Sequence, residues 1–549
     1  MAHSRGGDPL VVELPAGRLR GGLENGVAVF RGVPYAVPPT GPLRWRPTRP
    51  HAGWPGIRDA TVDGPSSPQP WVEGGDAVLG GHGAPPFDDD CLTVNIWTPA
   101  ADTARRPVLV WIHGGGFVTG SGSLPHYSGE AFARSGGVVV VTVNYRTGPL
   151  GYLYVGPGGS GGSGGSGATG GSDGPGGPSG PSGPSGPDGA DGADGVEANF
   201  WLGDQLAALR WVHDNIAYFG GDPDTVTVAG HSGGALSAAA LAAHPDARGL
   251  LKRVILQSPP LGLDLPGTAA YRERTDTYLE LAGVKTVEEL RALPWQLLIE
   301  ALGGLFERTG RWGHWPMPVL PVLDPETLPR HPAEALLHGQ AAANVDVMIG
   351  WTREEANFRF ALDQAHADAT REQVTDRIAE TFGAAAAPAV YAVYERHRPG
   401  ARPADVVMDL ITDEVFRVPG DGLAEARAAL GHPVWAYEFG LRTPALGGRL
   451  GAAHCLELPF VFDNFDRWAH VPFLTGIDPA ARDRLTRAMH RAWIAFVRTG
   501  DPNHPDLPLW QRYDTPARTT MRFDTRTATT PDPVGPARRL HAQRERANG

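Results

Sequence analysis

The sequence contains little cysteine and no long apolar run. Its 549 residues include only two cysteines, Cys91 and Cys455, which is too few for a disulfide framework in a chain of this length. No stretch of about 18 apolar residues occurs, and this excludes an ordinary membrane-spanning helix. Residues 1–9 are polar and lack the apolar segment of a secretory signal. We therefore expect a cytoplasmic protein without a membrane span.

Positive charge is also scarce. The chain has 48 lysine and arginine residues against 60 aspartate and glutamate residues, which gives a formal net charge of −12. Because binding to a nucleic-acid backbone depends on a basic surface, we expect no nucleic-acid partner. The chain also lacks a histidine cluster with metal-ligand spacing, and it lacks a dinucleotide or phosphate-binding motif between a strand and a helix. We therefore expect neither a metal nor a cofactor. No sequence pattern indicates an oligomeric state.

Short apolar segments rich in β-branched residues alternate with helical patterns. Nearly continuous apolar strands with helices between them are typical of a mostly parallel sheet that is covered by helices on both faces. The sequence thus predicts the α/β class with a central twisted sheet. The predicted strands cover residues 108–112, 138–143, 226–229, 254–256, 345–349 and 434–439.

One long segment has a different composition. Residues 156–195 consist of glycine, serine, proline, aspartate and alanine with a single threonine, and they include no apolar anchor. Such a segment cannot bury enough surface to offset its ordering entropy, which predicts a disordered loop. Because a helical pattern resumes directly after it, we expect an insertion within a single domain over residues 10–532. The charged residues 533–549 predict a frayed C-terminal tail.

A serine flanked by glycines follows the predicted strand 226–229. Residues 230–234 read Gly-His-Ser-Gly-Gly, and an alanine-rich helical run comes next. Glycines at positions 230 and 234 leave room for a strand and a helix to pack closely around a sharp turn that exposes the serine hydroxyl. Ser232 is therefore the candidate nucleophile. The alternative is a chance glycine-serine loop in a chain with 74 glycines.

A serine nucleophile also needs donors for the oxyanion that forms during its attack. Three glycines, 114–116, follow the predicted strand 108–112 closely. Consecutive glycines let backbone N–H groups turn toward one point without obstruction by side chains. We expect the N–H groups of Gly115, Gly116 and Gly233 to form an oxyanion hole. The alternative is a flexible turn.

Further motifs occur in an order that resembles a known family. They are Arg-Gly-Val-Pro-Tyr-Ala at 31–36, Pro-Leu-Arg-Trp at 42–45, Asp-Asp-Cys-Leu-Thr-Val-Asn-Ile-Trp at 89–97, Asn-Tyr-Arg-Thr-Gly-Pro-Leu-Gly at 144–151, and Asp-Asn-Ile at 214–216 with Phe-Gly-Gly-Asp-Pro at 219–223. This set is similar to that of the type-B carboxylesterases, the family that includes the cholinesterases, and it spans roughly residues 10–525 outside the insertion. The resemblance implies an α/β-hydrolase fold with large helical insertions over the active site. It also implies a serine esterase that forms an acyl-enzyme with a small-molecule ester.

The resemblance implies a catalytic acid within a Gly-x-x-x-Asp-Glu-Gly motif. In this chain the motif corresponds to residues 350–356, which read Gly-Trp-Thr-Arg-Glu-Glu-Ala. Position for position the acid is Glu355, Glu354 precedes it, and Ala356 replaces the usual glycine. The alternative is that both glutamates form a solvated acidic pair at the start of a helix.

The resemblance places the catalytic base at His454, which follows the serine and the acid in the chain order Ser…Glu…His of this fold. His231 is the alternative, because it adjoins the nucleophile. Adjacent residues on a tight turn project in different directions, however, so a base from another loop is favoured. Ser232, Glu355 and His454 are thus the expected catalytic triad.

Two of the departures from the family pattern bear on substrate and location. Many members carry glutamate directly before the nucleophile, where this chain has His231. The missing carboxylate disfavours a cationic alcohol such as choline. Ser67 stands where secreted members have the cysteine that pairs with the equivalent of Cys91. That disulfide cannot form here, in agreement with a cytoplasmic protein.

Two other functions fit the same motifs. A non-catalytic binding protein of this fold, as found among cell-adhesion relatives, usually lacks one residue of the triad, whereas all three candidates are present here. The same triad could also act on an amide or a thioester, because the pattern of residues does not distinguish the bond that is cleaved. Ester hydrolysis remains the favoured interpretation.

Overall fold

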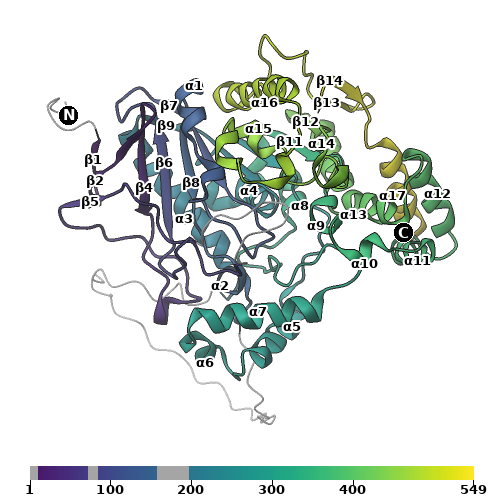
Figure 1. The fold of residues 1–549 in the computed structure, drawn as a ribbon. Coiled ribbons are helices and arrows are strands. Elements are labelled where there is room, and N and C mark those ends of the chain that lie inside the picture. The colour runs from purple at the N-terminus through teal and green to yellow at the C-terminus, as the bar shows by residue number, and fades with distance from the viewer. Residues whose placement is uncertain (1–9, 72–84, 157–196, 549) are drawn as a thin grey trace, which may run out of the picture.

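The computed structural model of the chain describes residues 10–71, 85–156 and 197–548. Figure 1 shows a central sheet with helices on both of its faces, and further helices gathered beyond the sheet. The insertion predicted at 156–195 lies outside the described residues, apart from Gly156. Within the described part of the chain, none of the helices has the length and apolar character needed to cross a membrane.

Eleven of the described strands form one sheet, in the order β14-β13-β12-β11-β10-β9-β7-β8-β6-β4-β3. Neighbouring strands pair in parallel from β8 through β13, and they pair antiparallel at both edges. The predicted mostly parallel sheet is confirmed, and each predicted strand overlaps an observed one. The strands are β3 (Gly22–Glu24), β4 (Val27–Pro34), β6 (Thr93–Thr98), β7 (Arg106–Ile112), β8 (Val139–Val143), β9 (Gly221–His231), β10 (Arg253–Gln257), β11 (Asp346–Thr352), β12 (Val434–Phe439), β13 (Thr519–Phe523) and β14 (Ala528–Pro531). A smaller sheet contains β1 (Val11–Leu14), β2 (Gly17–Arg20) and β5 (Ile57–Asp59).

Alternate side chains of the central strands belong to two different cores. In β7, Val108 and Val110 pack in one core, whereas Leu109 and Trp111 pack in the other. Successive side chains of a strand point to opposite faces of a sheet, so each face carries its own core. Helices α3 (Phe200–Asn215) and α4 (Gly233–Ala243) contribute to the first core, and α16 (Pro479–Thr499) contributes to the second. Burial on both faces explains why the strands are apolar almost throughout.

Two large helical insertions separate consecutive strands of the sheet along the chain. The first lies between β10 and β11 and the second between β11 and β12, where it has a third apolar core of its own. In Figure 1 the first insertion, with α5 to α7, lies below the sheet, and α10 to α13 of the second lie at its side. The remaining helices are α1 (Glu130–Gly136), α2 (Gly148–Tyr152), α5 (Thr268–Leu281), α6 (Val287–Ala292), α7 (Trp295–Thr309), α8 (Pro332–His338), α9 (Asn357–Phe360), α10 (Gln364–Ala367), α11 (Arg371–Phe382), α12 (Ala387–His397), α13 (Pro403–Thr412), α14 (Val418–Ala429) and α15 (Leu458–Phe462).

The C-terminal tail, residues 533–549, was predicted to fray, and the structure has a helix there, α17 (Gly535–Asn548). Val534 is buried, and the Arg538 side chain donates hydrogen bonds to Asp532 at 2.9 Å. These contacts fix the start of the helix against the rest of the protein, which a polar composition alone does not reveal.

Candidate active site

Ser232 occupies the turn between β9 and α4. Its backbone adopts φ 56° and ψ −125°, in the left-handed half of conformational space that residues other than glycine rarely enter. A Cβ atom on Gly230 would lie 2.2 Å from the backbone oxygen of Gly234, so the strand and the helix approach too closely for a side chain there. The Ser232 residue is 7% exposed. The chain therefore holds this serine in the strained strand-to-helix turn that its glycines predict.

Glu355 and His454 lie in contact although they come from different loops. Glu355 follows β11, and His454 lies in the loop between β12 and α15. The ring nitrogen His454 Nδ1 is 2.5 Å from Glu355 Oε2. The other carboxyl oxygen, Oε1, accepts a hydrogen bond from the Thr352 backbone N–H at 2.6 Å. Both carboxyl oxygens are thus engaged, and the carboxyl group fixes the orientation of the imidazole.

Burial controls the protonation of this pair. It raises the pKa of Glu355 to about 7, against the opposing effects of the Ser258 hydroxyl and the Thr352 N–H. Burial also lowers the pKa of His454 to about 3. Both pKa shifts arise because an apolar surrounding disfavours charge. The pair therefore takes up one proton far more readily than a second. When Glu355 is ionised, it accepts the Nδ1 hydrogen and leaves Nε2 of the ring as a proton acceptor.

Ser232, the third candidate residue, follows a histidine that contacts the Glu355–His454 pair. The rings of His231 and His454 are in contact, with their centroids 4.4 Å apart, and Ser232 is the next residue after His231. Among the described residues, the Ser232 hydroxyl makes no hydrogen bond to His454. Catalytic hydrogen bonds commonly tighten only when a substrate binds. The structure thus joins Glu355 to His454 and brings the residue adjoining Ser232 against the same ring.

The predicted oxyanion loop borders the serine. A Cβ atom on Gly114 would lie 3.1 Å from the Cβ of Ser232. Gly115 and Gly116 take φ values of 129° and 60°, which glycine adopts freely. On the other side of the serine, Gly233 begins α4. The glycine loop after β7 and the start of α4 therefore flank the turn at Ser232.

Three aromatic rings that the sequence did not identify surround His454. The ring centroid of Trp315 lies 5.8 Å from that of His454, Phe358 lies at 5.9 Å and Phe416 at 5.2 Å. Trp315 comes from the insertion after β10, whereas Phe358 and Phe416 come from the insertion after β11. The helical insertions thus cover the histidine with apolar surface, as the resemblance implied for this fold.

Comparison with known proteins identifies the family. The family model described as "Carboxylesterase family" matches residues 8–166 and 189–539. The chain belongs to this family. Phenmedipham hydrolase of Pseudarthrobacter oxydans is 46% identical over 510 residues, which cover 92% of this chain and 94% of the relative. Para-nitrobenzyl esterase of Bacillus subtilis is 32% identical over 528 residues, which cover 95% and 96% of the two chains.

A solved structure agrees with this assignment. The carboxylesterase EST55 of Geobacillus stearothermophilus superimposes with a TM-score of 0.79 and 36% sequence identity, over 97% of this chain and 99% of that one. The α/β-hydrolase fold and the type-B carboxylesterase resemblance are therefore confirmed. The protein is a carboxylic ester hydrolase, and the alternative of a non-catalytic binding protein is set aside.

This carboxylesterase has a second buried acid that sequence reasoning missed. Glu457 is fully buried, and its Oε1 lies 3.6 Å from His231 Nε2 and accepts a hydrogen bond from the Gln257 side chain at 3.2 Å. Burial raises the pKa of Glu457 to about 8, and the nearby Glu355 adds to the shift. The sequence did contain a signal, since an acid between two buried leucines, 456 and 458, needs a buried partner.

Proposed function

We propose that the enzyme hydrolyses carboxylic esters with Ser232 as nucleophile, His454 as general base and Glu355 as the acid that orients the base. The 2.5 Å contact between His454 Nδ1 and Glu355 Oε2 carries this proposal. A ring whose Nδ1 donates to a carboxylate keeps Nε2 available to accept a proton. The strained turn at Ser232, together with the contact of the adjoining His231 ring with His454, supports the role of the serine.

In the first half of the reaction, Ser232 Oγ attacks the ester carbonyl carbon and transfers its proton to His454 Nε2. Glu355 stabilises the resulting imidazolium. The N–H groups of Gly115, Gly116 and Gly233 donate to the oxyanion of the tetrahedral intermediate. His454 then protonates the alkoxy oxygen, the bond between that oxygen and the carbonyl carbon breaks, and the alcohol leaves an acyl group on Ser232.

In the second half, water replaces the alcohol. His454 removes a proton from the water molecule while the water oxygen attacks the acyl carbon. The same N–H donors stabilise the second tetrahedral intermediate. His454 returns its proton to Ser232 Oγ as the acyl group leaves, so the carboxylic acid is released and the enzyme is regenerated.

The surroundings of His454 support a substrate with an apolar group beside the reacting bond. Trp315, Phe358 and Phe416 supply aromatic surface there, and such surface binds apolar parts of a ligand. A panel of p-nitrophenyl esters with increasing acyl length measures this preference. Phenmedipham and a p-nitrobenzyl ester belong in the panel because relatives are named for them. An anilide and a thioester in the same panel test whether the triad cleaves those bonds instead.

The control for the whole panel is Ser232→Ala. We expect this substitution to lower kcat by roughly 10⁴- to 10⁶-fold for p-nitrophenyl acetate and butyrate. Circular dichroism of the variant should match that of the wild type, since the alanine side chain fits the volume of serine. Equal rates for the two proteins would rule out this mechanism.

The proposal also covers the location of the protein, the extent of its domain and the nature of the insertion. We propose a cytoplasmic location, which the thiol state of both cysteines supports, because Ser67 interacts with Cys91 where a disulfide partner would stand. Cell fractionation tests it. We also propose one domain over 10–532 with a disordered insertion at 156–195. Limited proteolysis should then cleave first within the insertion.

A further inference from the structure

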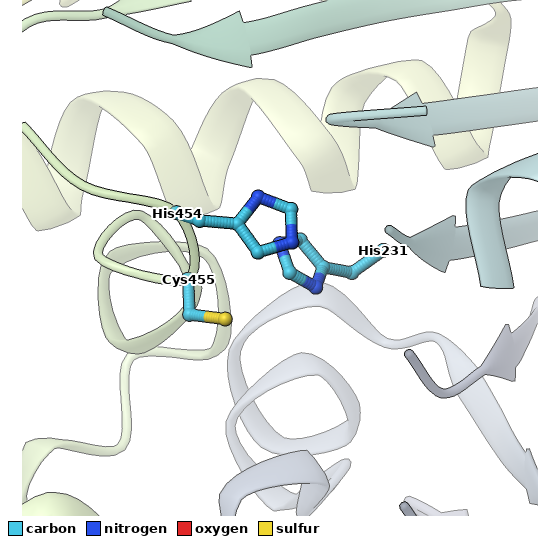
Figure 2. Close-up of side chains that lie close together, drawn as sticks. All are labelled: His231, His454 and Cys455. Atoms are coloured by element: carbon cyan, nitrogen blue, oxygen red, sulfur yellow. The ribbon is translucent and has the colours of Figure 1, made fainter. Parts of the chain in front are cut away.

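Three side chains beside the nucleophile form a cluster that the proposed mechanism does not fully use. His231 is the last residue of β9, whereas His454 and Cys455 lie in the loop before α15. One potential ligand atom from each residue lies within 4.8 Å of the other two. Figure 2 shows the two imidazole rings side by side with the Cys455 thiol on their flank. The sequence did not predict this cluster, because its residues come from two distant segments.

Each imidazole of the cluster faces a buried carboxyl group through one nitrogen. His454 Nδ1 is 2.5 Å from Glu355, and His231 Nε2 is 3.6 Å from Glu457. Histidines that bind a metal usually direct their other ring nitrogen toward a carboxylate, which fixes the ring and makes the ligating nitrogen more basic. In both rings the second nitrogen is therefore the one suited to a metal. Two carboxylate–histidine pairs thus converge at this cluster.

The polar atoms behind the cluster are not satisfied within the protein. Among the described residues, nothing forms a hydrogen bond with His231 Nε2 or with Glu457 Oε2, and both residues are buried. Buried polar atoms in this condition are rare in folded proteins. A cation held by the opposite nitrogen of His231 would polarise the Nε2–H bond toward the Glu457 carboxylate. The buried Nε2 atom would then have a favourable partner in Glu457 Oε1, which lies 3.6 Å away.

Cys455 supplies the ligand that selects the kind of metal. The backbone of Cys455 has a φ value of 73°, in the left-handed region that glycine adopts most readily. The residue at this position nevertheless carries a thiol side chain. The residue is partly exposed, whereas the two histidines are buried. Two imidazole nitrogens and one sulfur suit Zn²⁺, while Mg²⁺ and Ca²⁺ prefer oxygen ligands. A metal ion could enter from the side of Cys455.

We propose that His231, His454 and Cys455 bind Zn²⁺ and that the bound ion inhibits the esterase. Zinc lies about 2.3 Å from sulfur and about 2.0–2.1 Å from nitrogen in proteins, so rotations of the three side chains must draw the ligand atoms together by roughly 1 Å. The Cys455 thiol loses its proton to solvent as the Zn–S bond forms. The ion occupies the His454 nitrogen that accepts the serine proton. Binding is independent of the proposed function, whereas inhibition rests on it.

Inhibition is measured on the purified enzyme after treatment with a chelator. Hydrolysis of p-nitrophenyl butyrate should fall as buffered Zn²⁺ rises and should recover when the chelator is added again, whereas Mg²⁺ should have no effect. Cys455→Ser and His231→Gln should each raise the half-inhibitory Zn²⁺ concentration by at least about 10-fold, relative to the activity of the same variant without metal. The matched control is His213→Gln, which removes a partly exposed histidine on α3 and should leave that concentration unchanged. Equal sensitivity of all four proteins overturns the proposal.

Direct binding is measured with Co²⁺ as a spectroscopic substitute for Zn²⁺. The wild type and Ser232→Ala should both show a thiolate-to-cobalt charge-transfer band that is displaced by Zn²⁺, and Cys455→Ser should lack it. Because Ser232→Ala needs no esterase activity to bind the metal, this readout separates failure of the site from failure of the proposed mechanism. A wild type without the band overturns the proposal, and so does a band that persists in Cys455→Ser.

Discussion

His454 Nδ1 lies 2.5 Å from Glu355 Oε2 although 99 residues separate them in the chain. The order of the strands explains this contact. Ser232 follows β9, Glu355 follows β11, and His454 lies in the loop after β12, with β10 between the first two strands. Because these strands are parallel, their C-terminal ends meet at one edge of the sheet. Residues from three distant segments therefore gather at one site.

Substitution of Glu355 and of the adjacent Glu354 should have opposite effects on kcat and on thermal stability. Glu355→Gln should lower kcat by about 10⁴-fold, because an amide in that position favours the ring tautomer that carries hydrogen on Nε2. Glu354 instead forms a hydrogen bond with Arg442 at 2.7 Å and accepts the Ala452 N–H at 2.8 Å. Steady-state kinetics on p-nitrophenyl butyrate and thermal unfolding of both variants measure the difference.

The matched variant Glu354→Gln should lower the melting temperature and retain most of kcat. It removes the ion pairs of Glu354 with Arg442 and Arg398 and weakens the support of the loop that holds His454. It leaves the Glu355 carboxyl group against the His454 ring in place. If Glu354→Gln lost as much kcat as Glu355→Gln while remaining folded, the assignment of the acid would be wrong.

The two histidines in contact should differ in importance. His454→Gln should lower kcat by roughly 10⁴- to 10⁶-fold, because it removes the proposed base. His231→Gln should lower kcat by less than about 10²-fold, since His231 contacts the base without receiving the serine proton. Single-turnover measurements with p-nitrophenyl acetate report the acylation step directly. A larger loss in His231→Gln than in His454→Gln would exchange their roles.

The pH dependence follows from the buried pair. Burial raises the pKa of Glu355 to about 7 and lowers that of His454 to about 3. The pair therefore takes its first proton near the higher value, and a protonated Glu355 would donate to Nδ1 and leave the ring hydrogen on Nε2, where it blocks the base. We expect kcat/KM to be half-maximal near about pH 7, to be full well above it and to fall further as pH decreases. A constant kcat/KM between about pH 5 and about pH 8 would contradict this account.

The glycines of the proposed oxyanion loop should tolerate substitution unequally. A Cβ atom on Gly115 would lie 2.1 Å from the backbone oxygen of Thr119, whereas one on Gly116 would meet nothing closer than Met317 at 3.5 Å. Gly115→Ala should displace the loop and lower kcat by about 10²- to 10³-fold, the usual effect of losing an oxyanion donor. Gly116→Ala should cost less, because only its φ of 60° is unfavourable. Equal losses in the two variants would argue against the crowding at Gly115.

The sequence predicted the parts of the site that depend on local geometry. The turn at Ser232 requires glycine at 230 and 234 for close approaches between neighbouring segments, and these glycines are visible in the sequence. The identities of Glu355 and His454 came only from the register of the family motifs. Nothing local to either residue shows that their side chains meet, since the contact depends on the order of the strands.

The remaining features depend on tertiary packing. Trp315 and Phe416 reach His454 from two separate insertions, so no sequence pattern near the proposed triad predicts them. The helix at the C-terminus was missed because the ion pairs of Arg538 with Asp421 and Asp532 hold it. The cluster of His231, His454 and Cys455 was missed because its residues come from two distant segments. A search for ligand spacing within one segment does not detect residues that only the fold brings together.

Labelling by a fluorophosphonate tests the central claim most directly. The probe phosphonylates a serine only when a base activates it, and mass spectrometry of the digested protein identifies the modified residue. We predict a single adduct on Ser232 that forms in step with the loss of esterase activity, and we predict that it is absent from Ser232→Ala and strongly slowed in His454→Gln. Complete inactivation with the adduct on another residue, or with Ser232 unmodified, would contradict the proposed triad.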